Sequence, residues 1–499
     1  MTALDGNTTA FELAFLVLYA TLLVFLSVYG GHRYYLAWLY KRHKKNPWVP
    51  KARYEELPIV TIQLPMYNEM YVAERLIEAT CGIRYPRETL EIQVLDDSTD
   101  KTVEIASAAV AAWRAKGFDI HYIHRSDRTG FKAGALAKGL ETAKGEFVGV
   151  FDADFVPQPD FLERTVDFFT DPRIGMVQVR WDHLNRDYNL LTRAQAVMLD
   201  GHFIIEHTAR NRSGRFFNFN GTAGVWRRTT IDEAGGWQHD TLTEDLDLSY
   251  RAQIAGWQFV FLPDVLAPAE VPVEMNSFKS QQHRWAKGSI QTARKLLGLI
   301  WRSKLPLGVK AESFFHLTNN LAYLLMVVLC AILPASIAIR HKLQVPALMW
   351  LDLPAFLLST VSIGYFYYVC QREAGVSRRN AVKYLPVVLS VGIGMCINNT
   401  RAVIEALVGY QTGFTRTPKY GVTQAGDATW KQHTRYHLKR DWTPLVELGL
   451  GIYFTYAVYA SIEYGAWTAF PFMLMFQFGF MYMSMMSLWQ TRRRTAQSL

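Results

Sequence analysis

The sequence lacks the glycine-rich fingerprints of two large enzyme classes and contains few cysteines. Neither a Walker-type phosphate loop nor a GxGxxG motif is present, which argues against an ATPase and against a dehydrogenase. The spacing of the four cysteines matches no metal-ligand pattern, so we expect reduced, structural thiols. They are Cys81, Cys330, Cys370 and Cys396.

Long apolar runs are missing between Lys51 and Lys310. Outside that segment, five runs are each long enough to cross a hydrocarbon core of roughly 30 Å as a helix. They are Ala10 to Tyr29, Leu321 to Ile339, Leu353 to Cys370, Leu445 to Ile462 and Ala466 to Trp489. These lengths argue against five buried helices of a soluble protein. The first run lacks a basic leader and a small-residue cleavage site, so we expect a retained anchor.

The formal charge of +9 raises the possibility of nucleic-acid binding, but the distribution of the charge points elsewhere. Basic residues gather beside the apolar runs, at Lys41 to Lys45, Arg378 with Arg379, and Arg492 to Arg494, with Arg340 and Lys342 as exceptions. Such flanks are typical of the cytosolic side of a lipid bilayer. We therefore expect no nucleic-acid partner, a cytosolic middle segment and an amino terminus outside a plasma, inner or Golgi membrane.

One further stretch, 381–409, is only partly apolar. Its apolar core runs from Val387 to Ile397 and is followed by Asn398, Asn399 and Arg401, which favours an interfacial helix over a span. This placement keeps loop 410–440 in the cytosol and gives five crossings. Six parts are then predicted: an anchor with a basic linker (1–50), a cytosolic catalytic domain (51–275), an interfacial amphipathic helix (276–312), a transmembrane hairpin (313–380), an interfacial helix with a loop (381–440), and a second hairpin with a cytosolic tail (441–499).

The middle segment alternates apolar strands with helical stretches. The expected strands are Ile59 to Pro65, Glu91 to Ser98, Asp119 to Arg125 and Glu146 to Asp154. Strands separated by helices of this length predict an α/β domain with a mostly parallel sheet. Ligands of such a sheet bind at the carboxyl ends of its strands.

Three of these strands end in groups that can carry out chemistry. The groups are Tyr67, Asn68 and Glu69 after the first, Asp96 and Asp97 after the second, and Asp152 and Asp154 after the fourth. Any one carboxylate could be a loop or cap residue, but convergence on one edge favours a site. Because Asp152 and Asp154 stand two apart in an extended segment, they predict a site for Mg²⁺ or Mn²⁺. That cation would bridge the diphosphate of a nucleotide sugar.

Two later segments add candidate residues. The stretch LTEDLDL predicts a helix start, where Thr243 could act as a cap and Glu244 and Asp245 could favour the positive helix end. The functional interpretation makes Asp245 a general base for an acceptor hydroxyl. The next helix carries Arg284, suited to phosphate, and Trp285, whose flat face can pack on a sugar ring. Its alternative is a membrane-surface helix.

With these residues assembled, the chain resembles the processive family 2 glycosyltransferases of the cellulose-synthase superfamily. The four signature motifs are DDS (Asp96 to Ser98), DAD (Asp152 to Asp154), TED (Thr243 to Asp245) and QQHRW (Gln281 to Trp285). The stretches QVLDDSTD, GFKAGAL, FDADF and FNGTAGVWR are similar to the cellulose-synthase-like A and C branches, which make mannan, glucomannan or glucan. The resemblance implies a GT-A catalytic domain and either UDP-glucose or GDP-mannose as donor.

The resemblance also implies roles for individual residues. It implies donor contacts by Tyr67, Glu69, Asp97, Lys132, Asp152 and Arg284, acceptor contacts by Gln281, Trp285, Gly221, Thr222 and Ala223, a metal ion at Asp154 with Asp152, and Asp245 as base beside Glu244. The segment FTRTPK is similar to the gating-loop pattern FxVTxK. Phe414, Thr417 and Lys419 match it as implied donor contacts, whereas Arg416 replaces the valine.

Three functions remain open at this point. The first is a processive, inverting synthase of a β-linked, β-1,4-type polysaccharide whose growing chain leaves through the membrane helices. Aromatic residues that either line that path or pack in the core are Tyr323, Phe356, Tyr365, Tyr367 and Phe478. The second is a glycolipid synthase that acts on a ceramide, diacylglycerol or polyprenyl acceptor. The third is a catalytically silent transporter or scaffold.

Overall fold

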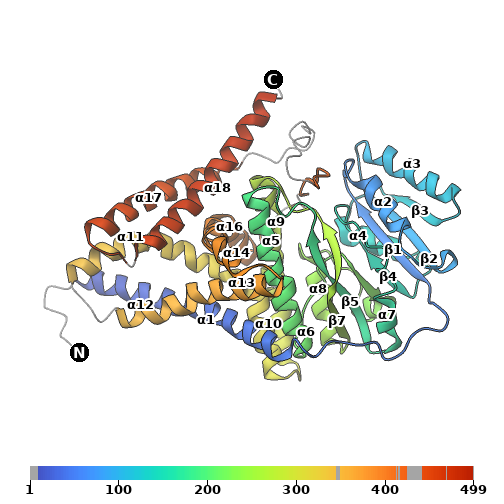
Figure 1. Ribbon diagram of the computed structural model, residues 1–499, viewed down its shortest axis with the longest axis horizontal. Helices are drawn as coiled ribbons and strands as arrows, with labels where there is room; N and C mark the ends of the chain where they lie inside the picture. The colour runs from blue at the N-terminus through green and yellow to red at the C-terminus, as the bar shows by residue number, and fades with distance from the viewer. Residues whose placement is uncertain are drawn as a thin grey trace.

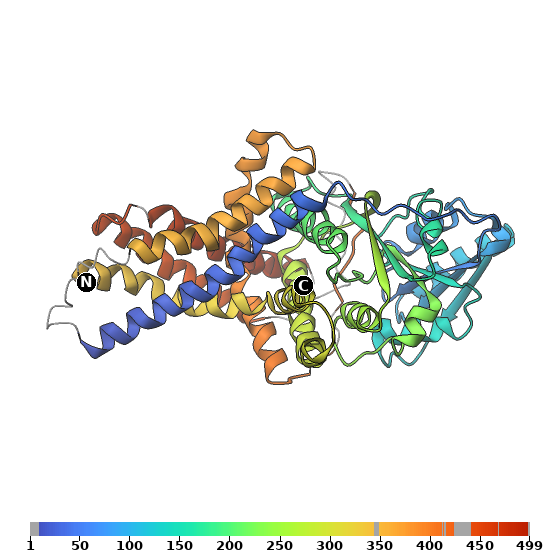
Figure 2. The same ribbon diagram turned by 90° about the horizontal axis from the view of Figure 1, so that it is seen from below.

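The computed structural model of the chain describes residues 9–343, 349–411, 413, 416–423, 441–467 and 469–497. Within them the chain forms two parts that lie side by side, a bundle of long helices and an α/β domain (Figures 1 and 2). The predicted combination of an α/β domain with long apolar helices is confirmed.

One seven-stranded sheet forms the centre of the α/β domain. Its strands are β1 (Val60–Met66), β2 (Leu90–Asp96), β3 (Asp119–His124), β4 (Phe147–Val150), β5 (Ile174–His183), β6 (Gly224–Arg227) and β7 (Gln258–Ala269). Their order is β3-β2-β1-β4-β6-β5-β7. The first four strands are parallel as predicted, β6 runs antiparallel to both neighbours, and β7 runs parallel to β5. The later strands therefore make the sheet mixed.

Short helices connect these strands and cover the sheet (Figure 1). They are α2 (Ala73–Cys81), η1 (Arg87–Thr89), α3 (Thr102–Ala115), α4 (Phe131–Leu140), η2 (Val166–Thr170), α7 (Arg228–Glu233) and α8 (Glu244–Ile254). The predicted helix start at the TED motif coincides with the first residues of α8.

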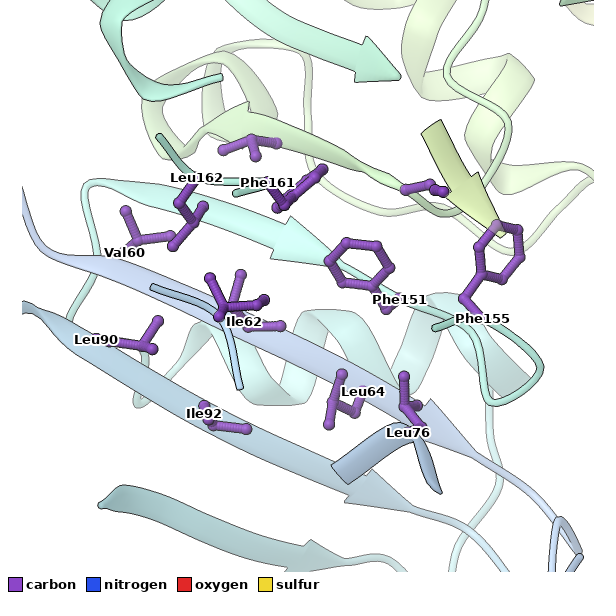
Figure 3. Packing of buried hydrophobic residues seen from close by; sticks show 14 of the residues in the cluster. Val60, Ile62, Leu64, Leu76, Leu90, Ile92, Phe151, Phe155, Phe161 and Leu162 are labelled. Carbon is purple, nitrogen blue, oxygen red and sulfur yellow. The ribbon is translucent and has the colours of Figure 1, made fainter. Parts of the chain in front are cut away.

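Strand β1 is buried on both faces of the sheet, and both faces specify how it pairs with β2. Val60, Ile62 and Leu64 enter one apolar core, which Figure 3 shows. On the opposite face the Thr61 hydroxyl donates to the Glu91 carboxylate at 2.6 Å, also out of contact with water. Because buried polar groups need such partners, the pairing of β1 with β2 is specified by both faces.

The helical part contains several candidate membrane spans. Among the residues that the structure describes, four helices are long and apolar enough to cross a membrane: Ala10–His43, Asp352–Glu373, Thr443–Glu463 and Phe470–Thr491. Two bent pairs could each form one more span: Leu307–Thr318 with Leu321–Ser336, bent by 54°, and Arg378–Gly394 with Cys396–Leu407, bent by 41°. The five expected crossings lie within this range of four to six. The second bent pair contains stretch 381–409, and the interfacial placement of that stretch stays a prediction.

In the sequence, one helix of the helical part precedes the α/β domain and the others follow it. They are α1 (Ala10–His43), α10 (Leu307–Thr318), α11 (Leu321–Leu343), α12 (Met349–Phe356), the π-helical η5 (Leu357–Val361), α13 (Ser362–Glu373), α14 (Arg378–Lys383), α15 (Leu385–Gly394), α16 (Cys396–Leu407), α17 (Thr443–Glu463) and α18 (Phe470–Gln497). All four cysteines are free and buried, in agreement with the expected reduced thiols.

Two helical segments lie at the junction of the two parts (Figure 1). One is α9 (Met275–Arg302), and the other is the continuous run of α5 (Leu190–Asp200), the π-helical η3 (Gly201–His207) and α6 (Thr208–Arg212). Buried ion pairs join α9 to the membrane helices: Lys279 to Glu447 at 2.6 Å and Lys287 to Glu405 at 2.9 Å. These largely buried ion pairs fix the position of α9.

Candidate active site

A cavity of about 190 Å³ opens at the carboxyl ends of β1, β2 and β4, where the sequence predicts a ligand site. The predicted site residues that line it are Tyr67, Glu69, Asp97, Lys132, Asp152, Asp154, Gly221, Glu244, Asp245, Gln281, Arg284, Trp285, Thr417 and Lys419. Thr222 and Ala223 are buried behind this wall, and Phe414 lies outside the described residues. Residues that lie far apart in the sequence therefore meet in one place.

The loop after β4 carries the DAD carboxylates. Lys132 of α4 makes an ion pair with Asp152 and donates to the Gly221 carbonyl at 2.8 Å. The Thr222 hydroxyl accepts a hydrogen bond from the Asp152 backbone N–H at 2.9 Å. Thr222 therefore holds the DAD loop from behind and does not face the cavity, while Ala223 adopts a positive φ of 56° next to it.

Two further carboxylates that line the cavity, those of Asp97 and Glu69, also have cationic partners. Arg125 grips Asp97 through two nitrogens at 2.8 and 2.6 Å. Arg416 holds Glu69 in the same bidentate manner, at 2.9 and 2.6 Å. Burial raises the pKa of Glu69 despite the opposing effect of Arg416. The acidic edge predicted from the strands is therefore an edge of paired charges.

An aromatic side chain and a cation are stacked at the mouth of the donor side. The Arg128 guanidinium lies 3.3 Å from the centre of the Tyr67 ring. At that distance the planar guanidinium is stacked on the aromatic face by a cation–π interaction. Both residues line the cavity.

The first turn of α8 places two carboxylates on the cavity wall. Thr243 precedes the helix, but its side chain makes no capping hydrogen bond, so the capping interpretation is wrong. Its hydroxyl instead faces that of Thr292, at 3.4 Å, because α9 packs against this turn. Burial, and then the neighbouring Glu244 carboxylate, raise the pKa of Asp245 to about 7.

Gly221 leaves the space in front of Asp245. Its φ is +79°, and a Cβ atom built on it would lie 3.0 Å from Asp245 Oδ2. Only glycine combines that backbone conformation with that clearance. The approach to Asp245 is therefore open to a ligand atom.

Helix α9 presents the QQHRW motif in two directions. Gln281, Arg284 and Trp285 line the cavity. His283 points to the other side, where its Nε2 lies 3.2 Å from Glu405 of α16. The alternative interpretation as a membrane-surface helix therefore accounts for one side of α9 at most.

Segment 416–422 crosses the cavity although it lies far along the chain. The Arg284 guanidinium donates to the Thr417 hydroxyl at 2.9 Å, and Lys419 makes an ion pair with Asp154. The Tyr420 hydroxyl donates to Glu274 at 3.0 Å. These contacts place the described part of the FTRTPK segment against the cavity residues, and its contact with a donor stays a prediction. Arg416, which replaces the valine of the pattern, pairs with Glu69.

The model of the family described as glycosyltransferase like family 2 matches residues 58–288. The chain is 40% identical to glucomannan 4-beta-mannosyltransferase 2 of Arabidopsis thaliana over 65% of this chain and 63% of that relative, and so spans less than two thirds of it. It is 35% identical to glucomannan 4-beta-mannosyltransferase 7 of the same plant over 84% of this chain and 74% of the relative. The chain belongs to glycosyltransferase family 2.

The resemblance to the cellulose-synthase superfamily, and to its cellulose-synthase-like A branch, is thereby confirmed. Among solved structures, the fold is similar to that of the mannosyltransferase PcManGT from Pyrobaculum calidifontis in complex with GDP-Man and Mn²⁺. The TM-score is 0.56 at 23% identity, over 79% of this chain and 100% of that one. This likeness supports the GT-A fold of the present glycosyltransferase.

Among the described residues, one cluster of three potential metal ligands occurs, formed by Glu91, Asp119 and His121. It lies at the amino ends of β2 and β3, and Lys144 already pairs with Asp119 at 2.7 Å. That cluster is away from the cavity and carries no catalytic interpretation. The DAD pair remains the candidate metal position.

Several cavity residues of the glycosyltransferase were not predicted. Arg128 follows β3 and lines the cavity, and the nearby Arg125 holds the lining residue Asp97. The rule that strand ends carry function would have found both if basic residues had been considered with acidic ones. Asn220 lines the cavity one residue before the predicted Gly221. Trp181 and Glu270 come from β5 and the end of β7, which the sequence does not place near the motifs.

Proposed function

We propose that the chain is a membrane-embedded, inverting glycosyltransferase that extends a β-1,4-linked mannan or glucomannan, with GDP-mannose as its donor and UDP-glucose as the alternative donor. The observation that carries the proposal is that Asp245, Gly221 and both DAD carboxylates line one and the same cavity. The names of the two plant relatives favour mannose as the transferred sugar.

The proposed reaction is a direct displacement at the anomeric carbon. An acceptor hydroxyl gives its proton to Asp245 as its oxygen bonds to the anomeric carbon, and the bond to the diphosphate oxygen breaks with its electron pair. One displacement inverts the configuration, so an α-linked donor gives a β-linked product. A base with a pKa near 7 is suited to this step because it is largely ionised just above neutral pH.

The DAD carboxylates fit a hard divalent cation. Asp152 and Asp154 offer oxygen ligands of the kind that Mg²⁺ and Mn²⁺ prefer, and each already attracts an ammonium group, from Lys132 and Lys419. When bound, the cation would neutralise charge on the departing diphosphate. Lys132, Arg284 and Lys419 would hold the phosphate oxygens, and Tyr67 with Arg128 would border the base.

Acceptor contacts are proposed for the opposite wall. Trp285 would pack on the terminal sugar, and Gln281 would donate or accept a hydrogen bond beside it. Gly221 would leave room for the attacking hydroxyl, with Thr222 and Ala223 supporting the loop. Phe414 remains a proposed donor contact from outside the described residues.

The membrane part would receive the product. We propose that the catalytic domain is cytosolic, that the amino terminus lies outside, and that the growing polysaccharide enters between the helices next to η3. Of the aromatic residues considered, Tyr367 is in tight packing with Gly201 at that position. Phe356 packs against Phe472, with ring centres 4.9 Å apart, which favours core packing for that residue.

The test is a donor panel with product analysis. Purified protein in detergent is incubated with GDP-mannose or UDP-glucose and Mg²⁺ or Mn²⁺, and the product is digested with β-mannanase or β-glucanase. We expect polymer from GDP-mannose that β-mannanase degrades, and none from the D245N variant. A product that organic solvent extracts as a glycolipid would contradict the polymer proposal and support the second function. No transfer or donor hydrolysis with any donor would favour the silent scaffold.

A further inference from the structure

A buried polar cluster joins membrane helix α1 to the segment next to the cavity. Glu206 of η3 accepts from Arg33 of α1 and from Arg210 of α6, the latter at 3.1 Å. Arg210 also donates to Glu312 of α10 at 2.9 Å, and Glu312 binds His32 of α1 at 2.9 Å. The charges of two arginines and two glutamates balance, and none of these five side chains lines the cavity.

The π-helical geometry of η3 explains how this cluster reaches the site. In a π-helix the turn is wider than in an α-helix, so residues four and five apart lie on one side. His202, Glu206 and His207 therefore share a side of η3, and the two imidazole rings pack with centres 4.3 Å apart. Both rings contact the side-chain amide of Asn220, at 2.9 and 2.6 Å.

The partners of each atom fix the direction of the hydrogen bonds. The Asn220 amide nitrogen only donates, so His202 Nε2 accepts at 2.9 Å and the His202 proton sits on Nδ1. That N–H points at Glu206, at 3.3 Å. His207 Nε2 faces two oxygens, those of the Asn220 side chain and the Asn218 carbonyl, and so carries its proton there.

The charges around these groups stabilise the same arrangement. Burial opposes the ionisation of Glu206, but Arg33 and Arg210 outweigh it and hold the pKa of this carboxyl well below its usual range. Burial, with the nearby His202 and Arg210, holds the pKa of His207 well below its usual range. An ionised Glu206 and a neutral His207 are the forms that the hydrogen-bond directions require.

Asn220 itself belongs to the wall of the cavity, directly before the Gly221 that faces Asp245. We propose that His202, held by Glu206 and through it by Arg33 of the membrane helix, is a positioning residue that fixes the orientation of the Asn220 amide toward the acceptor sugar. This inference rests on the proposed function, because it takes the space before Asp245 to be where an acceptor hydroxyl binds.

Two conservative variants separate positioning from a general structural role. In H202Q the side-chain oxygen occupies the place of Nε2 and still accepts from Asn220, whereas H202L offers no acceptor. A matched control is E373Q, which removes an ion pair between Lys44 of α1 and Glu373 of α13 at 2.7 Å, away from the cavity. R33Q tests the link to the membrane helix.

The experiment uses the full-length protein in detergent with saturating GDP-mannose. The acceptor is β-1,4-mannotetraose, supplied at a series of concentrations. Release of GDP without acceptor and GDP binding report on the donor side alone. For H202L we expect an acceptor KM higher by about tenfold, the worth of one oriented hydrogen bond, with GDP affinity within about twofold of wild type. H202Q and E373Q should stay within about twofold in both, and R33Q should raise the acceptor KM by a smaller factor than H202L.

Three results would overturn the inference. The first is an unchanged acceptor KM in H202L. The second is an equal rise of the acceptor KM in H202L and H202Q. The third is a rise of the acceptor KM in H202L accompanied by an equal weakening of GDP binding. Wild-type protein that binds GDP but transfers nothing to the acceptor would instead overturn the proposed function, and the inference with it. Thermal unfolding of each variant identifies a parallel loss as a folding defect.

Discussion

Two sets of paired charges in this molecule use the same residue types for different ends. At the cavity, Lys419 pairs with Asp154 and Arg416 with Glu69, and both pairs face a space that a ligand can enter. At the junction, Lys279 pairs with Glu447 and Lys287 with Glu405, and none of these four residues lines that cavity. The difference teaches that a cation beside a carboxylate marks a functional site only when a competing charged ligand has access to it.

The largest expected effect is the loss of transfer rate on replacement of Asp245, a carboxylate of the cavity. D245N keeps the shape of the side chain but cannot accept the acceptor proton. The transfer rate should fall by about 10³-fold, within the range for general-base catalysis. Radiolabelled sugar incorporation measures the rate, and calorimetric binding of GDP should remain within about twofold. A variant that still makes polymer at a tenth of the wild-type rate would remove Asp245 from the role of base.

Removal of one junction charge should act on stability instead. K279M leaves Glu447 buried without its partner, which costs roughly 3 kcal/mol of unfolding free energy. The double variant K279M/E447L replaces both charges with apolar groups and should recover most of that loss. The midpoint of thermal unfolding in detergent measures both. Equal midpoints for the single and double variants would show that the ion pair is not what fixes α9.

The pH profile should follow the raised pKa of Asp245. A base acts in its deprotonated form, so the transfer rate increases as pH rises through the pKa of about 7. Between pH 6 and pH 8 the ionised fraction changes by about tenfold, and the rate should change by the same factor. Glu244 lies next to this group, so the profile reports the pair. A rate that is flat over this interval in buffered steady-state assays would contradict the assignment.

The smallest expected effect concerns a cavity pair. K419Q removes the ammonium group from Asp154, so Mn²⁺ no longer has to displace it. In the absence of nucleotide we expect Mn²⁺ to bind about fivefold more tightly, the worth of one partly exposed ion pair. Electron paramagnetic resonance of free Mn²⁺ measures this affinity without turnover. The matched variant K138Q removes an exposed pair with Glu141 outside the cavity and should leave it unchanged. Equal affinity in K419Q and wild type would place the cation elsewhere.

Local periodicity predicted the parallel half of the sheet and the start of α8 because these depend on neighbours in the chain. It also predicted the strand-end residues, since parallel strands carry their carboxyl ends to one edge. The antiparallel β6 depends on a pairing with β4 that no short pattern encodes. The capping interpretation of Thr243 was wrong because packing with α9 redirected its hydroxyl.

Charges that meet across the fold were beyond local patterns. Lys279 and Glu447 are 168 residues apart. In the sequence Lys279 looks like a position of an amphipathic helix, and Glu447 looks like a lone charge within the apolar run Leu445 to Ile462. Arg416 stood out as a departure from a motif, and its partner Glu69 was named separately, but nothing short of the fold joins them. Site residues that come from one strand end are predictable in this way, whereas their counter-charges are not.

The pairing of Lys279 with Glu447 also has a consequence for biosynthesis. The α/β domain is complete in the chain well before α17 leaves the ribosome, since domains generally fold in order of synthesis. During that interval the Lys279 ammonium lacks the Glu447 carboxylate, so α9 is not yet joined to α17. The nascent enzyme should therefore have a folded α/β domain attached to α1 and should be susceptible to proteolysis at α9. It should become resistant to proteolysis at α9 only when α17 and α18 are in place.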